Sequence, residues 1–120
     1  MPLLLGSFSY ALAGLGQLLR TQRNFRVELG AGIAAAAAGT FFGLERWEWV
    51  VLVLTIALVL VLEALNTALE HAVTLASPNV DPRAKVAKDV AAAAVLIAAL
   101  SSIAIGALLY LPRLTAMLAR

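Results

Sequence analysis

The stretch EALNTALE, residues 63–70, carries polar side chains at the spacing of one helical face. Four of them stand at i, i+3, i+4 and i+7: Glu63, Asn66, Thr67 and Glu70. Glu63 directly follows a long apolar run, so we expect it at the boundary between an apolar and an aqueous environment. An ionisable group there is a candidate base, although a lone carboxylate could also reach water or pair with an arginine. Because the stripe is polar throughout, it needs an equally polar partner.

A partner is available in PRAKVAKDVAAAAV, residues 82–95, where Lys85, Lys88 and Asp89 share a helical face. Lysine donors beside an aspartate suit a polyphosphate and its metal ion, since phosphoryl transfer depends on neutralising and positioning charge. Lysines that merely flank a membrane span would explain Lys85 and Lys88 but not Asp89. A third polar segment, RTQRNFRVE at residues 20–28, is expected on the same side. The three segments therefore predict one interfacial site.

The composition indicates a membrane protein. Of 120 residues, 62% are hydrophobic and 13% are charged, and the mean hydropathy is +0.94. So few charged residues cannot cover the surface of a water-soluble globular protein of this size. The net charge of +2 gives no argument for a nucleic-acid partner. The absence of cysteine excludes a disulfide framework, a cysteine zinc site and a thiol nucleophile.

Uncharged runs locate the elements that must position these residues: Met1–Leu19, Leu29–Leu44, Trp49–Leu62 and Val90–Pro112. The last run predicts a spanning helix that ends at Pro112. The second run reaches span length if Val27 and Glu28 form its first turn, and its Ala and Gly residues suit close helix contact. The third run continues without Gly or Pro until Pro78, which predicts one helix that leaves the membrane for water.

The first run is diluted by Gly, Ser and Gln, and its apolar residues repeat at helical spacing: Phe8, Ala11, Leu12, Leu15 and Leu19. We therefore expect an amphipathic surface helix rather than a fourth span. A cleaved signal peptide is not expected, because no positively charged region precedes the apolar stretch.

Basic residues set the expected orientation. Six fall on one side, namely Arg20, Arg23, Arg26, Arg83, Lys85 and Lys88, and three on the other, namely Arg46, Arg113 and Arg120. The first side is predicted to be cytoplasmic. Trp47 and Trp49 are expected to be interfacial anchors at the outer turn. Without an internal repeat or a linker, residues 1–120 are expected to form one domain.

EALNTALE followed by AKVAKD and a small-residue span resembles the prokaryotic diacylglycerol kinase and undecaprenol kinase family. SFSYALAGL and TQRNFRVEL, near the start of the chain, are similar to the family's surface helix and the entry to its first span. The resemblance implies a homotrimer in the bacterial inner membrane, with three spans and a surface helix per chain. It also implies phosphorylation of a lipid hydroxyl by magnesium ATP at the cytoplasmic face, without a P-loop.

The resemblance assigns roles to residues. Glu63 is expected to be the general base, oriented by Asn66. The expected ATP-binding residues are Tyr10, Gln22, Glu70, Lys88 and Asp89, and the magnesium ligands among them are Glu70 and Gln22. The expected lipid-binding residues are Asn24, Phe25, Arg26 and Glu28.

Three positions depart from the family pattern. Gln22 stands where many members have a metal-binding Glu, and a neutral oxygen donor is expected to bind magnesium more weakly. Thr74 stands where members often have Asp, and Asp81 where many have His. His71 points off the polar stripe and is expected to be a solvated surface residue.

Two questions stay open on the sequence. TQRNFR and AKVAKD favour a polyprenol over diacylglycerol as the lipid, without excluding the latter. A small multidrug transporter would also be a short Ala-rich oligomer with a membrane carboxylate, but it would have four clear spans and a carboxylate near mid-bilayer. A catalytically silent membrane subunit is a third reading, to which Gln22 lends some support.

Overall fold

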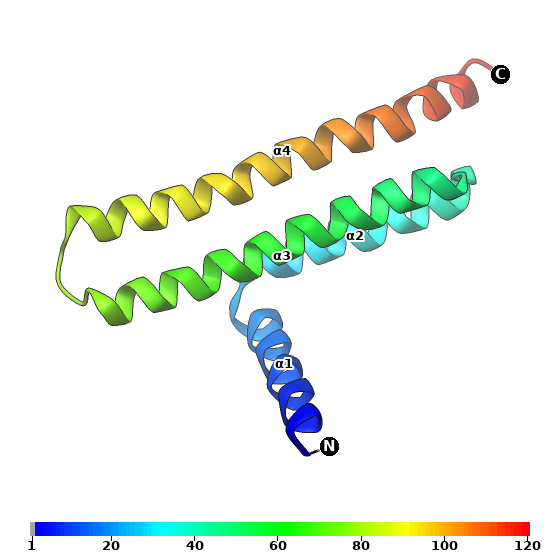
Figure 1. The fold of residues 1–120 in the computed structure, drawn as a ribbon. Helices are drawn as coiled ribbons and strands as arrows, with labels where there is room; N and C mark the ends of the chain where they lie inside the picture. Colours follow the sequence, from blue (N-terminus) through cyan, green and yellow to red (C-terminus); the bar gives the residue numbers. More distant parts are fainter. Residues whose placement is uncertain (1) are drawn as a thin grey trace.

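The computed structural model describes residues 2–120, which form four helices joined by short turns and contain no strand. The helices are α1 (Pro2–Thr21), α2 (Arg23–Phe42), α3 (Arg46–Ala76) and α4 (Pro82–Leu118). α2, α3 and α4 run alongside one another, whereas α1 projects away from them (Figure 1). Three of the described helices, α2 to α4, are long and apolar enough to cross a membrane. The predicted all-helical fold with three spans and a separate N-terminal helix is therefore confirmed.

The turns follow from local sequence. Gly43 ends α2 in a left-handed conformation with φ 73°, which a residue with a side chain rarely adopts. At the start of α4, the Asp81 carboxylate accepts the backbone N–H of Arg83 at 2.8 Å, and Pro82 occupies the first turn. The Arg83 guanidinium also donates to Asp81, and these bonds hold the pKa of Asp81 below its ordinary value. The α3–α4 turn is thus fixed at its α4 side.

α2 packs closely on α3 because glycines face that contact. A Cβ atom added at Gly32 would lie 2.9 Å from Cγ2 of Ile56, and one added at Gly39 would lie 2.9 Å from the ring of Trp49. Both distances are shorter than real Cβ contacts, so a side chain at either position would force a neighbouring group to shift. The close approach expected from the small residues of this span is confirmed at these two glycines.

Most of the apolar surface of the bundle faces outward. The buried core is small, and large apolar side chains on the outer faces of α3 and α4 are more than half exposed, including Val53, Leu58, Ile97 and Leu108. In water these faces would be costly, because apolar surface is stabilised only when it is removed from solvent. A lipid bilayer removes that cost.

The prediction that the last span ends at Pro112 is wrong, since α4 continues to Leu118. A proline in a helix removes one N–H donor, here the donor to the Leu108 carbonyl, and membrane helices tolerate such a loss. Beyond the proline, the Arg113 guanidinium donates to the Leu109 carbonyl at 2.9 Å and so ties the next turn to the preceding one.

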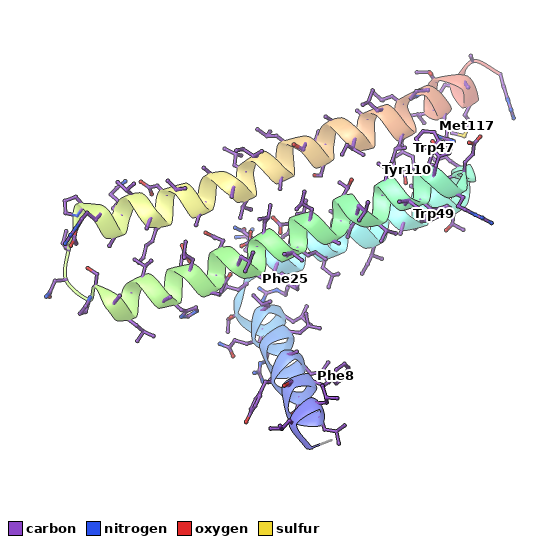
Figure 2. All side chains as sticks on the ribbon, viewed as in Figure 1. Phe8, Phe25, Trp47, Trp49, Tyr110 and Met117 are labelled. Carbon is purple, nitrogen blue, oxygen red and sulfur yellow. The ribbon has the colours of Figure 1, made fainter. Side chains whose placement is uncertain are left out.

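The end of the bundle opposite the α3–α4 turn contains a partly buried ion pair that the charge pattern did not reveal. Both oxygens of Glu48, which is 5% exposed, accept from Arg113, at 2.5 and 2.7 Å. Nearby, the Tyr110 hydroxyl donates to the Ala35 carbonyl at 2.6 Å. These bonds connect α4 to α3 and α2, and Figure 2 shows Tyr110 at the end of the bundle where Trp47 and Trp49 lie. Trp47 faces outward as expected of an anchor, whereas Trp49 is half-buried.

Candidate functional site

Three buried oxygen atoms without hydrogen-bond partners gather where the start of α2 lies beside the middle of α3. They are Oε2 of Glu28, Oε2 of Glu63 and Oδ1 of Asn66, and none has a donor among residues 2–120. Glu63 is 3% exposed, and its carboxylate is close enough to that of Glu28 for the two to repel each other. Buried acceptors are costly unless a donor satisfies them. We call Glu28, Glu63 and Asn66 the acceptor cluster.

Neighbouring residues fix the acceptor cluster in place. The Thr67 hydroxyl donates to the backbone carbonyl of Glu63 at 3.0 Å, and Thr67 is itself buried. Phe25 is buried one turn before Glu28 and lies near the point where α1 meets α2 (Figure 2). Because the Thr67 hydroxyl donates its hydrogen to a backbone carbonyl of its own helix, it cannot donate to the free side-chain oxygens of the acceptor cluster.

An apolar groove of about 320 Å³ begins at the acceptor cluster and continues between α2, α3 and α4. It is lined by Glu28, Gly32, Ile56, Val59, Ile103 and Tyr110, among others, and Glu28 is the one carboxylate among its lining residues. The groove therefore places a carboxylate at one end of an apolar channel. The sequence pattern gave no sign of it, because its lining residues are apolar or small on three separate helices.

A polar pocket of about 570 Å³ lies between the last turns of α3 and the first turns of α4. Its charged lining residues are Glu70, Asp81, Lys85, Lys88 and Asp89. Lys85 pairs with Asp89 at 2.6 Å, whereas Lys88 donates to the Thr74 hydroxyl at 2.9 Å. Within residues 2–120, no carboxylate lies within 4 Å of the Lys88 ammonium. The pocket thus contains an ammonium whose charge is not neutralised.

The acceptor cluster and the polar pocket are separate along α3. Glu63 and Glu70 are two turns apart on that helix, a rise of about 10 Å. Figure 1 shows that the α3–α4 hairpin extends well beyond the point where α1 leaves the bundle. If α1 marks the membrane surface, the cluster lies at that surface and the pocket lies in water. The sequence predicts that the three polar segments form one site, whereas the structure separates the acceptor cluster from the polar pocket as two adjoining sites.

The structure does not bring every predicted ATP-binding residue to the polar pocket. Tyr10 is 80% exposed on α1 and is not among the lining residues. Gln22 precedes α2 as its N-cap residue, and its amide donates to the Thr21 hydroxyl at 3.2 Å. Asn24, expected at the lipid site, is exposed at the start of α2. None of these side chains lines the polar pocket of its own chain.

Arg26 has a structural contact that the sequence did not indicate. Its guanidinium donates to the carbonyls of Leu19 and Arg20 at 2.9 and 3.2 Å, so it caps the C-terminal end of α1. A cation is favourable at that end of a helix. In one chain, Arg26 therefore fixes the direction in which α1 leaves α2.

Metal ligands are sparse in a single chain. No group of three His, Cys, Asp or Glu residues within the part of the chain that the structure describes could hold an ion. Glu70 has no ion-pair partner among residues 2–120, whereas Asp89 is paired with Lys85. This donor set fits magnesium that arrives with a polyphosphate, because such ions need one or two carboxylates and take other oxygens from phosphates and water. His71 is exposed, as expected.

Comparison with known proteins identifies the family. Residues 9–110 match the family described as prokaryotic diacylglycerol kinase. A diacylglycerol kinase of Synechocystis sp. is 45% identical over 118 residues, which cover 98% of this chain and 67% of that protein. An undecaprenol kinase of Bacillus subtilis is 42% identical over 108 residues, covering 90% of this chain and 88% of that protein. A diacylglycerol kinase of Sinorhizobium sp. is 34% identical over 93 residues, covering 78% and 67%.

The chain therefore belongs to the prokaryotic diacylglycerol kinase family, and the resemblance inferred from its motifs is confirmed. It is a bacterial membrane enzyme of the lipid kinase class, with three helices able to span a membrane. A kinase requires a nucleotide co-substrate. Neither the transporter reading nor the silent-subunit reading is favoured by these relatives.

Proposed function

We propose that the protein transfers the γ-phosphoryl group of ATP to the hydroxyl of a membrane lipid at the cytoplasmic face of the membrane. The observation that carries the proposal is the buried, unpartnered carboxylate oxygen of Glu63 beside the free oxygen of Asn66. A lipid hydroxyl supplies the donor that the Glu63 oxygen lacks. The apolar groove that begins at Glu28 gives the apolar chain of the same lipid a place to lie.

Glu63 is the general base in this proposal. The lipid hydroxyl donates to its carboxylate and attacks the γ-phosphorus, so a new P–O bond forms while the bond to the β-phosphate oxygen breaks. The hydroxyl proton passes to Glu63, and ADP leaves with the electron pair of the broken bond. The Asn66 amide N–H donates to the hydroxyl oxygen and orients it, and Glu28 lines the lipid side of the site. A positioned base of this kind contributes about 10²- to 10⁴-fold to the rate.

The polar pocket binds the nucleotide. The unneutralised ammonium of Lys88 attracts the phosphates, and Asp89 keeps the neighbouring Lys85 in place. Glu70 and Gln22 hold magnesium with the ATP, and the ion supplies neutralisation of phosphate charge when it is bound. The pocket lies about two helical turns from Glu63, on the side where the γ-phosphate must approach the lipid.

We further propose a homotrimer in which residues 1–120 of each chain act as one lipid kinase domain. Tyr10 and Gln22 lie away from the polar pocket of their own chain, so a complete nucleotide site needs a neighbouring chain. The outward-facing apolar side chains of α3 and α4 leave room for such neighbours. Asn24, Phe25 and Arg26 line the lipid side of the site in this arrangement.

The lipid is proposed to be a polyprenol, with diacylglycerol as the other candidate. The relatives include kinases named for each lipid, and the undecaprenol kinase aligns over most of its own length as well as of this chain. TQRNFR and AKVAKD favour the polyprenol.

The test is transfer of labelled γ-phosphate from magnesium ATP into undecaprenol and into diacylglycerol, each presented in mixed micelles. Label in a chromatographically identified lipid phosphate supports the proposal and identifies the lipid. A folded protein that labels neither lipid contradicts the proposal, whereas labelling of diacylglycerol alone contradicts the preference for a polyprenol.

A further inference from the structure

The Thr74 hydroxyl makes a different hydrogen bond from those of the other threonines in α2 and α3. The hydroxyls of Thr40, Thr55 and Thr67 donate to the carbonyl four residues earlier in their own helices, at 2.7 to 3.1 Å. The Thr74 hydroxyl makes no such bond among residues 2–120 and instead accepts from the ammonium of Lys88 at 2.9 Å. Thr74 is on α3 and Lys88 is on α4, so this bond crosses the hairpin.

The contact has an electrostatic consequence. The other lysine of the polar pocket, Lys85, is neutralised by Asp89 at 2.6 Å. Lys88 is held by a neutral acceptor, so its position is fixed while its charge stays available. A carboxylate acceptor would hold the ammonium as firmly but would cancel much of its attraction for an anion.

We propose that Thr74 is a positioning residue for the nucleotide: it holds Lys88 across the α3–α4 hairpin for contact with the phosphates. This inference rests on the proposed function, since it takes the polar pocket to be the nucleotide site. The ligand class is a nucleoside polyphosphate. Both groups line that pocket, and the loop that closes it comes from the same hairpin.

The variant that tests the proposal is Thr74→Val, which removes the hydroxyl and keeps the branched shape. A hydrogen bond to a charged group is worth roughly tenfold in binding, so KM for ATP should rise about tenfold. KM for the lipid should stay unchanged, because the acceptor cluster is two turns away. Thr74→Ser keeps the hydroxyl and should restore KM for ATP to within about twofold of the wild type.

A double-variant cycle separates positioning from a structural effect. If Thr74 acts through Lys88, then Thr74→Val should add little to KM in a Lys88→Met background. The matched control is Thr40→Val, which removes a hydroxyl bonded only within α2 and should leave KM for ATP unchanged. Helix content measured by circular dichroism confirms that each variant is folded.

Binding of a non-hydrolysable ATP analogue with magnesium, measured by calorimetry in micelles, gives a readout that does not need turnover. Thr74→Val should weaken this binding by about the same tenfold. An unchanged affinity and KM in Thr74→Val, or a full additional loss in the Lys88→Met background, overturns the inference. The proposed function fails separately, when the wild-type protein transfers no phosphate at all.

Discussion

The fit between α2 and α3 predicts how the enzyme responds to a single added methyl group. In Gly32→Ala the new Cβ would lie 2.9 Å from Cγ2 of Ile56, where ordinary contacts are 3.4–4 Å. Cγ2 moves only if χ1 of Ile56 rotates, and that torsion is stiff in a helical β-branched residue, so we expect the helices to separate by a few tenths of an ångström. Overpacking of this kind costs about 1–3 kcal/mol.

Gly30→Ala is the matched control, because a Cβ atom at Gly30 meets nothing within 4 Å in the described chain. Both variants gain about 1 kcal/mol of helix propensity, so the difference between them isolates the contact. We expect Gly32→Ala to be less stable than Gly30→Ala by about 1–3 kcal/mol in unfolding by SDS titration from mixed micelles. Ile56→Leu, which has no Cγ2, should recover part of that loss.

The same contact controls catalysis in this account. Glu28 is one turn before Gly32, so a displaced α2 moves Glu28 away from Glu63. Misplacement of reacting groups by about 1 Å costs about 10²-fold, and a smaller shift should lower kcat on the order of tenfold. Equal stability and equal kcat in Gly32→Ala and Gly30→Ala would refute the idea that close packing of α2 on α3 sets the site geometry.

Two further predictions concern the ends of the bundle. Arg113→Met leaves the buried carboxylate of Glu48 without its cation and should lower the thermal stability measured by circular dichroism. The double variant Arg113→Met with Glu48→Gln should regain part of the loss. A melting curve of Arg113→Met like that of the wild type would contradict a stabilising role for the ion pair. Asp81→Ala removes the cap of α4 and should destabilise the protein near pH 6. The pKa of Asp81 is held below its ordinary 3.8, so the stability that the carboxylate adds is complete above pH 3.8 and is lost as the pH falls through the lower folded-state pKa. A stability difference between wild type and variant that persists below the folded-state pKa would contradict this prediction.

The fold was largely predictable because hydropathy and charge spacing determine spans directly. Three spans, the long α3 helix and the separate α1 follow from uncharged runs and from the positions of Gly and Pro. Pro112 was misjudged because a single missing donor does not end a helix whose neighbouring turns stay bonded. The sequence did not predict the ion pair of Glu48 and Arg113, because the two residues are far apart in the chain and each follows the pattern of a charged residue in a loop outside the membrane.

The residue types of the candidate site could be predicted from the sequence, but the separation of the acceptor cluster from the polar pocket could not. Helical spacing places Glu63, Asn66 and Glu70 on one stripe, yet only the structure shows which neighbour each one meets. Glu63 faces Glu28 from α2, whereas Glu70 faces α4 across the polar pocket. The hydrogen bond between Thr74 and Lys88 depends on how α3 and α4 pack against each other across the turn. The periodicity of residues within one helix cannot predict which residues of two helices meet.

Glu63→Gln tests the central claim most directly. The amide keeps the size of the side chain but cannot accept the hydroxyl proton, so kcat for phosphoryl transfer to the lipid should fall by about 10²-fold or more. Binding of the non-hydrolysable ATP analogue should stay as in the wild type, because Glu63 does not line the polar pocket. A Glu63→Gln variant that retains a kcat close to that of the wild type would contradict the account.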